Sequence, residues 1–296
     1  MTPGRCELLR ALGAIADNPA DARAACRALG LPELDSHQHT EMFVLNCPPY
    51  ASVYLGPDGA LGGEGADRVA GFWRVIGISP PAEPDHLSSL LSLYASLGQA
   101  AAGSTRAATA AALARAQAAL LSEHLWPWLP AYLDTALDLA APAVTAWARL
   151  TRIAVGTEIS AHPVPPLLPL ALRAAPAAPT PDGSLGDLVG ALLTPVRSGI
   201  ILTRRRLTDA AGEAGVGHRI GERRFTLRAM LEQDPAATLS WLAGESGRWT
   251  RRHASRAPDG GVSQWWAARA ACTTRLLREL TARTSMSGRP AGVSVP

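Results

Sequence analysis

Apolar residues recur three and four positions apart through most of this chain, and this spacing constrains the fold more than any other feature. In residues 5–16 it places four large side chains on one helical face: Leu8, Leu9, Leu12 and Ile15. Strand signals are weak, because no Asn-Gly or Asp-Gly turn is flanked by alternating apolar runs. Aromatic residues make up only 5% of the chain, so Leu, Ala and Val must fill the core, which favours helices. The sequence predicts an all-α fold.

Prolines predict the division of the chain into domains. Residues 161–184 contain seven prolines and little periodicity, which indicates an irregular linker. We expect a helical bundle in residues 1–160, an Arg-rich helical region in residues 185–284 and a disordered tail in residues 285–296.

Three local expectations concern the first domain. A helix should cover Ser36–Leu45, and the Pro- and Gly-rich residues 47–65 should form a loop. The uninterrupted Ala-rich stretch Ser104–Leu125 should form the longest helix of this domain.

Charge is distributed unevenly along the chain. Residues 1–160 hold 10 Arg and 15 acidic residues, whereas residues 197–256 hold 12 Arg and 6 acidic residues. The two halves therefore face different partners, or each other. No apolar run reaches roughly 18 residues, and the N-terminus carries no apolar signal core, so we expect no membrane span and no secretory signal. Scattered cysteines suit a reducing cytoplasm: Cys6, Cys26, Cys47 and Cys272.

The sequence gives little support for catalysis. It contains no G-x-S-x-G, no H-E-x-x-H and no complete phosphate-binding loop. His37 and His39, with Cys47 nearby, do not form a convincing zinc site, because side chains two positions apart on a helix point to different faces. We therefore predict no catalytic residues, no metal and no cofactor. A hydrolase or nucleotide-binding enzyme is a distant third hypothesis.

The Arg-rich region suggests a rival function. Arg204–Leu207, the joint from Gly215 to Gly217 and the segment Ile220–Leu231 imitate a helix-turn-helix. Four arginines at helical spacing are candidates for phosphate contacts: Arg219, Arg223, Arg224 and Arg228. The alternative function is therefore a helical nucleic-acid-binding regulator, and the other interpretation of these arginines is a solvated or packed helical face.

The first domain contains polar and aromatic residues that a plain helical bundle does not require. PPYASVY, EPDH and HLWPW contribute seven candidates: Tyr50, Tyr54, Asp85, His86, His124, Trp126 and Trp128. An aromatic surface with carboxylates suits a peptide that has cationic and apolar parts. The competing interpretation places the rings in the core and makes Asp85 only the N-cap of the following helix.

These segments resemble, in this order, the TorD/DmsD/NarJ family of molybdoenzyme-specific chaperones. Three motifs carry the resemblance: EMFVLNCPPYASVYLGPDGALGG, EPDHLSSLLSLYASL and EHLWPWLPAYLD. The resemblance covers Cys6–Ile159. It implies a TorD-like helical fold without catalytic activity. It also implies a cytoplasmic chaperone that binds the twin-arginine signal peptide and the apo form of a molybdopterin-containing oxidoreductase precursor, aiding cofactor insertion and delaying export.

By the same resemblance, Asp85 and His86 contact the signal peptide and Tyr50 and Tyr54 line the neighbouring surface. Two departures affect this transfer. The acidic-Pro-Asp-His motif is one residue shorter than in some members, and His39 stands where an aromatic residue is common. The role of residues 185–284, the client enzyme, the choice between monomer and homodimer, and any binding of molybdenum cofactor or GTP stay open.

Overall fold

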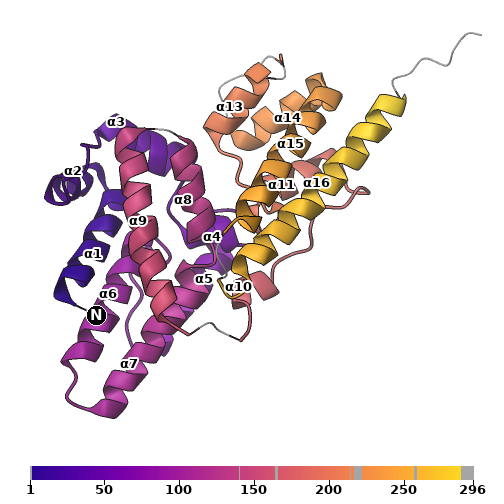
Figure 1. Cartoon of the computed structure of the whole chain (residues 1–296). Coiled ribbons are helices and arrows are strands. Elements are labelled where there is room, and N and C mark those ends of the chain that lie inside the picture. The colour runs from indigo at the N-terminus through magenta and orange to yellow at the C-terminus, as the bar shows by residue number, and fades with distance from the viewer. Residues whose placement is uncertain are drawn as a thin grey trace, which may run out of the picture. The chain divides into compact units, whose positions relative to one another are not determined.

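The computed structural model describes residues 2–139, 141–163, 166–213, 215–216, 222–256 and 259–287, with residues 285–287 described by their backbone only. Every regular element within these ranges is a helix, apart from one isolated bridge between Tyr50 and His86 (Figure 1). The predicted all-α fold is confirmed. None of the described helices combines the length and the apolarity needed to cross a membrane.

The chain forms two compact units. Unit 1 comprises Met1–Ala175 with Pro258–Val262. Its helices are α1 (Pro3–Asp17), α2 (Pro19–Ala28), α3 (Ser36–His39), the π-helix η1 (Thr40–Asn46), α4 (Ala51–Leu55), α5 (Gly63–Val75), α6 (Leu87–Gly103), α7 (Ala107–Ala119), the π-helix η2 (Leu120–Leu125), α8 (Leu129–Asp138), α9 (Pro142–Ala161) and α10 (Leu170–Arg173).

Helix α1 packs along α6 and buries the apolar face that the spacing predicts. Leu9, Leu12 and Ile15 are all at most 2% exposed. Gly13 allows the closest approach, because a Cβ there would lie 2.9 Å from the Cα of Ser88 at the start of α6. This close crossing brings the end of α1 beside the first turn of α6 and so positions the candidate site.

One local expectation for unit 1 is wrong, and two are right only in part. Residues 47–65 were expected to form a loop, but they contain α4 and the start of α5. The expected helix Ser36–Leu45 is one α-helical turn followed by η1. The expected helix Ser104–Leu125 is divided into α7 and η2, so α9 with 20 residues is the longest helix of this unit. Periodicity alone does not register the extra residue per turn of a π-helix, which proteins often use at functional sites.

Unit 2 comprises Pro176–Ala257 with Ser263–Pro296. Its helices are α11 (Leu185–Leu193), α12 (Pro195–Ser198), α13 (Arg204–Glu213), α14 (Arg223–Gln233), α15 (Pro235–Ala254) and α16 (Val262–Ser287). The buried carboxylate of Glu245 accepts hydrogen bonds from Arg206 at 3.1 Å and from Trp249 at 3.1 Å, and it also pairs with Arg248. This network ties α13 to α15.

The Pro-rich segment and the C-terminal tail differ in part from the prediction. Most of residues 161–184 is irregular, but Leu170–Arg173 form the helical turn α10. The boundary between the two units falls at Ala175, inside this segment. Residues 285–287, expected to be disordered, extend α16 instead, and residues 288–296 lie outside the described residues.

Candidate functional site

Two of the sequence motifs lie side by side in unit 1. The N–H of Ala51 donates to the carbonyl of Asp85 at 3.0 Å, and the N–H of Leu87 donates to the carbonyl of Pro49 at 2.8 Å. The indole N–H of Trp73 on α5 donates to the carbonyl of Pro84 at 3.2 Å, which fixes the acidic-Pro-Asp-His segment from a third element. The Pro-Pro-Tyr and Pro-Asp-His motifs therefore form one rigid junction.

Asp85 has a structural role different from the one expected. We expected it at the N-cap of the following helix, but the N-cap of α6 is His86. The Asp85 carboxylate instead accepts a hydrogen bond from the N–H of Ser52, at 2.9 Å, in the first turn of α4. Asp85 is only 3% exposed. It therefore caps α4 across the junction, because an acceptor can satisfy a free N–H of a helix from any segment that approaches it.

His86, and not Asp85, caps the N-terminus of α6. Its Nδ1 accepts a hydrogen bond from the N–H of Ser88 at 3.2 Å, and its ring meets the Tyr50 ring nearly edge-on, with the centroids 4.7 Å apart. Burial lowers the pKa of His86, while the nearby carboxylates of Asp17 and Glu83 partly oppose that shift. The cap requires an unprotonated Nδ1, so the neutral imidazole is the form that suits this junction.

Two exposed carboxylates flank the paired rings. The hydroxyl of Tyr50 donates to Glu83 at 2.8 Å. Beside the His86 ring, the Asp17 carboxylate lies 3.8 Å from Nδ1 and accepts a hydrogen bond from the hydroxyl of Ser88 at 3.3 Å. Burial raises the pKa of Tyr50, and hydrogen bonding to Glu83 raises it further. We call this row of four residues, Glu83, Tyr50, His86 and Asp17, the ring–carboxylate row.

Tyr54 and Trp128 do not line a surface, contrary to expectation. Tyr54 is 2% exposed and Trp128 is fully buried, and their rings stack with centroids 5.2 Å apart and planes 7° apart. The hydroxyl of Tyr54 donates to the backbone carbonyl of Pro48 at 3.0 Å. The indole N–H of Trp128 donates to the backbone carbonyl of His124 at 2.9 Å. These two rings belong to the core, because the α4 helix turns Tyr54 inward.

His124 and Trp126 are also engaged within unit 1. His124 is buried against Phe72, with ring centroids 4.9 Å apart, and burial lowers its pKa to about 4. Trp126 is half-buried, and its indole N–H donates to Asp259 at 3.3 Å. Of the seven candidates, the structure places Tyr50, Asp85 and His86 at the junction. It places Tyr54 and Trp128 together in the core, and His124 and Trp126 against other parts of unit 1.

The motifs did not identify Asp17 as part of this site. It ends α1, nearly 70 residues from His86, and in the sequence it precedes an ordinary Asn-Pro helix boundary. Only the crossing of α1 over α6 at Gly13 places it beside Ser88 and His86. No local pattern in the sequence indicates this contact.

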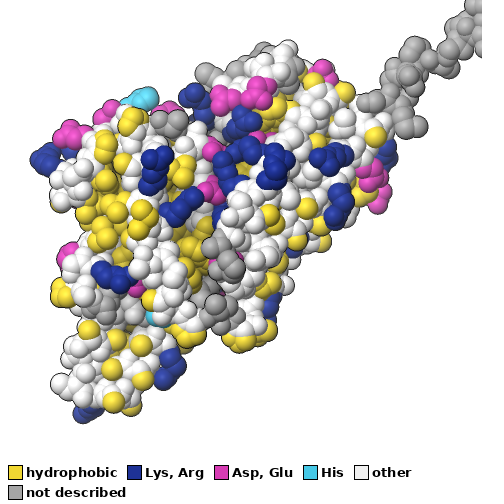
Figure 2. Space-filling model, in the orientation of Figure 1, with side chains coloured by type: hydrophobic (Ala, Val, Ile, Leu, Met, Phe, Trp, Pro, Cys, Tyr) yellow, Lys and Arg dark blue, Asp and Glu magenta, His cyan; other side chains and the backbone are white. Residues whose placement is uncertain are grey.

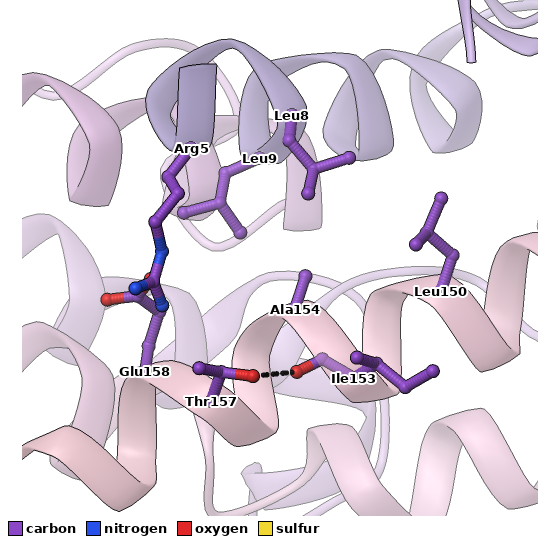
Figure 3. Close-up of a pocket in the computed structure, with 8 residues that line it drawn as sticks. All are labelled: Arg5, Leu8, Leu9, Leu150, Ile153, Ala154, Thr157 and Glu158. Carbon is purple, nitrogen blue, oxygen red and sulfur yellow. Dashed lines mark hydrogen bonds and ion pairs between the residues drawn. The ribbon is translucent and has the colours of Figure 1, made fainter. Parts of the chain in front are cut away.

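A second feature on α1 is an apolar pocket between α1 and α9 (Figure 3). Leu8 and Leu9 face Leu150, Ile153 and Ala154 across a volume of about 210 Å³. At one end Arg5 pairs with Glu158, as the close-up shows. Figure 2 shows hydrophobic side chains grouped over α1 and α9 on this face. We call this feature the α1–α9 pocket.

Metal binding and helix-turn-helix geometry gain no support from the described residues. Within them, no group of three or more His, Cys, Asp or Glu side chains is arranged to hold a metal ion. Helices α13 and α14 are separated by residues 214–222, whereas a helix-turn-helix uses a turn of about three or four residues. Gly217, Arg219 and Ile220 of that hypothesis lie outside the described residues. Arg228 pairs with Glu232 at 2.8 Å.

The fold and the junction together define an all-helical domain with a rigid aromatic and acidic junction. Residues 6–134 match the family model described as the nitrate reductase delta subunit. This part of the chain is similar to that family, whose NarJ/TorD-type members are chaperones in the maturation of redox enzymes. The matched segment is less than half of the chain and lies entirely in unit 1. A comparison with curated proteins found no match.

Proposed function

We propose that this chain is a cytoplasmic, non-catalytic chaperone that binds the twin-arginine signal peptide of a molybdopterin oxidoreductase precursor. By holding the peptide and the apo-enzyme, it would delay export until the cofactor is inserted. The ring–carboxylate row is the single observation that carries this proposal. It lies within the segment that matches the chaperone family.

The chemistry of the row suits guanidinium groups. Glu83 and Asp17 are exposed, and Tyr50 between them is half-buried. A guanidinium pairs with a carboxylate through two parallel hydrogen bonds and stacks on an aromatic face. The excess of acidic residues in residues 1–160 adds a favourable field for a cationic peptide. Asp85 and His86 support this surface by fixing the starts of α4 and α6.

The α1–α9 pocket offers a place for the apolar part of the same peptide. Its residues Leu8 and Leu9 share helix α1 with Asp17. Asp17 stands eight positions after Leu9, which corresponds to about 12 Å along a helix. An extended peptide of about four residues covers a similar distance. The apolar segment that follows the two arginines of a signal peptide therefore matches the separation of the two features along α1.

Isothermal titration of the full chain with a twin-arginine peptide and its Lys-Lys variant tests the proposal. We expect tighter binding of the Arg-Arg peptide, because an ammonium group lacks the planar two-point contact. Binding should weaken as salt increases. Equal affinity for both peptides, or no binding of either, would contradict the proposal. Salt-sensitive binding to duplex DNA instead would favour the nucleic-acid alternative.

A pull-down from cells that produce a molybdoenzyme precursor provides a second test. We expect the full-length precursor to co-purify with the chain and the precursor without its signal peptide to be captured less. The same yield of both forms would place recognition outside the signal peptide.

A further inference from the structure

Asp17 is a carboxylate of the junction that keeps freedom to accept a ligand. Its side chain is 44% exposed, whereas Asp85 is 3% exposed and already accepts the Ser52 N–H. Its described partner is the hydroxyl of Ser88, at a long 3.3 Å, with Nδ1 of His86 at 3.8 Å. A donor from a ligand can therefore reach Asp17 without displacing a helix cap.

Asp17 and Glu83 lie at opposite ends of one chain of contacts. Glu83 is bonded to the Tyr50 hydroxyl, Tyr50 meets the His86 ring, and His86 lies against Asp17. The two exposed carboxylates thus flank different rings of one pair. Consecutive side chains of an extended peptide point to opposite sides. Two adjacent arginines therefore need acceptors on the two sides of the peptide, and Glu83 and Asp17 stand at opposite ends of the ring pair.

His39 on α3 lies against the last turn of α1, the helix that ends at Asp17. It is 3% exposed, and its Nε2 has no hydrogen-bond partner among the residues that the structure describes. The ring interacts with the backbone of Ile15 on α1, and the charge of Asp17 raises the pKa of His39 against the larger effect of burial. A buried polar atom without a partner is costly, but this nitrogen is enclosed by the protein and adds no ligand contact to the row.

We propose that Asp17 is a specificity-determining residue that accepts one guanidinium of the twin-arginine motif, while Glu83 beside Tyr50 accepts the other. This inference rests on the proposed function and assigns a residue on α1 to it. Asp85 is then a positioning residue whose carboxylate stays within the protein.

Titration of full-chain variants with four peptides, Arg-Arg, Arg-Lys, Lys-Arg and Lys-Lys, tests this assignment. Asp17→Asn should weaken Arg-Arg binding by about tenfold, because a charge-assisted hydrogen bond is lost. The same variant should bind one of the single-Lys peptides as the parent does, since that peptide already lacks the paired guanidinium. Glu83→Gln should show the same pattern with the other single-Lys peptide.

Control variants separate local contact from net charge and from folding. Asp67→Asn removes an exposed carboxylate from α5 and should change the affinity by less than about twofold. Asp17→Glu keeps the charge and should retain more affinity than Asp17→Asn. Thermal unfolding of each variant should match the parent, since an amide side chain in place of the Asp17 carboxylate keeps an oxygen for the hydroxyl of Ser88.

The outcomes distinguish this inference from the function on which it rests. If the parent binds Arg-Arg and Lys-Lys peptides equally, the proposed function fails. If the parent prefers Arg-Arg but Asp17→Asn binds like the parent, or loses no more affinity than Asp67→Asn, the assignment of Asp17 is wrong. The same reduction for all four peptides would also overturn it.

Discussion

Replacement of Asp85 by Ala tests the cap that joins the two motifs. The change removes the acceptor of the Ser52 N–H, and Ser52 is fully buried, so water does not replace the lost hydrogen bond. Leaving a buried donor unsatisfied costs about 1–3 kcal/mol, and losing a helix cap costs a similar amount. Because these are two descriptions of one interaction, we expect a loss of about 2 kcal/mol in the free energy of unfolding.

That loss corresponds to a fall of about 4–8 °C in the melting temperature of a unit of this size. Amide hydrogen exchange localises the effect, because α4 has only five residues and is not stable by itself. We expect the Ser52 amide in Asp85→Ala to exchange faster than in the parent by more than the global loss explains.

Two control variants define the comparison. Asp85→Asn keeps an oxygen for the Ser52 N–H and should lose about half as much stability. Asp58→Ala removes an exposed carboxylate just after α4 and should stay within about 0.5 kcal/mol of the parent. The reasoning is refuted if Asp85→Ala melts like the parent, or if its Ser52 amide stays as protected as before.

Three further predictions follow from packing, titration and ion pairing. Gly13→Ala should lower the free energy of unfolding by about 1–3 kcal/mol, because the new Cβ would meet backbone 2.9 Å away. Gly71→Ala in α5 meets open space and should raise the free energy of unfolding by about 0.5–1 kcal/mol. Urea unfolding compares the two variants. The pKa of His124 is about 4 in the folded chain and 6.5 in the unfolded chain. Between these pH values the unfolded chain binds more protons, so the stability that is complete above pH 6.5 is lost as the pH falls towards 4. His124→Gln should therefore make stability between these pH values less steep, by up to about 1.4 kcal/mol per pH unit, and an unchanged slope would contradict the shifted pKa. Glu245→Ala should lower the free energy of unfolding by about 3 kcal/mol, because Arg206 and Arg248 lose a buried acceptor. Guanidine unfolding of the full chain measures this loss.

The amino-acid sequence was sufficient to predict the fold class and most of the helices. The apolar spacing of α1, with Leu9, Leu12 and Ile15 on one face, specifies a helix whatever it packs against. The seven prolines of residues 161–184 exclude a long helix because proline interrupts the helical hydrogen bonds. Short motifs also indicated the family, since the residues that form the junction are contiguous within each motif.

The packing of the helices, in contrast, selects the residues that occupy the site. Asp85 looks like the cap of α6, but the junction turns its carboxylate to α4 and leaves the cap to His86. Tyr54 resembles a surface ring until a short helix directs it onto Trp128. Asp17 joins the site because Gly13 lets α1 cross α6 closely. Local spacing determines which side of an element a residue faces, whereas contacts between distant segments depend on how the helices pack.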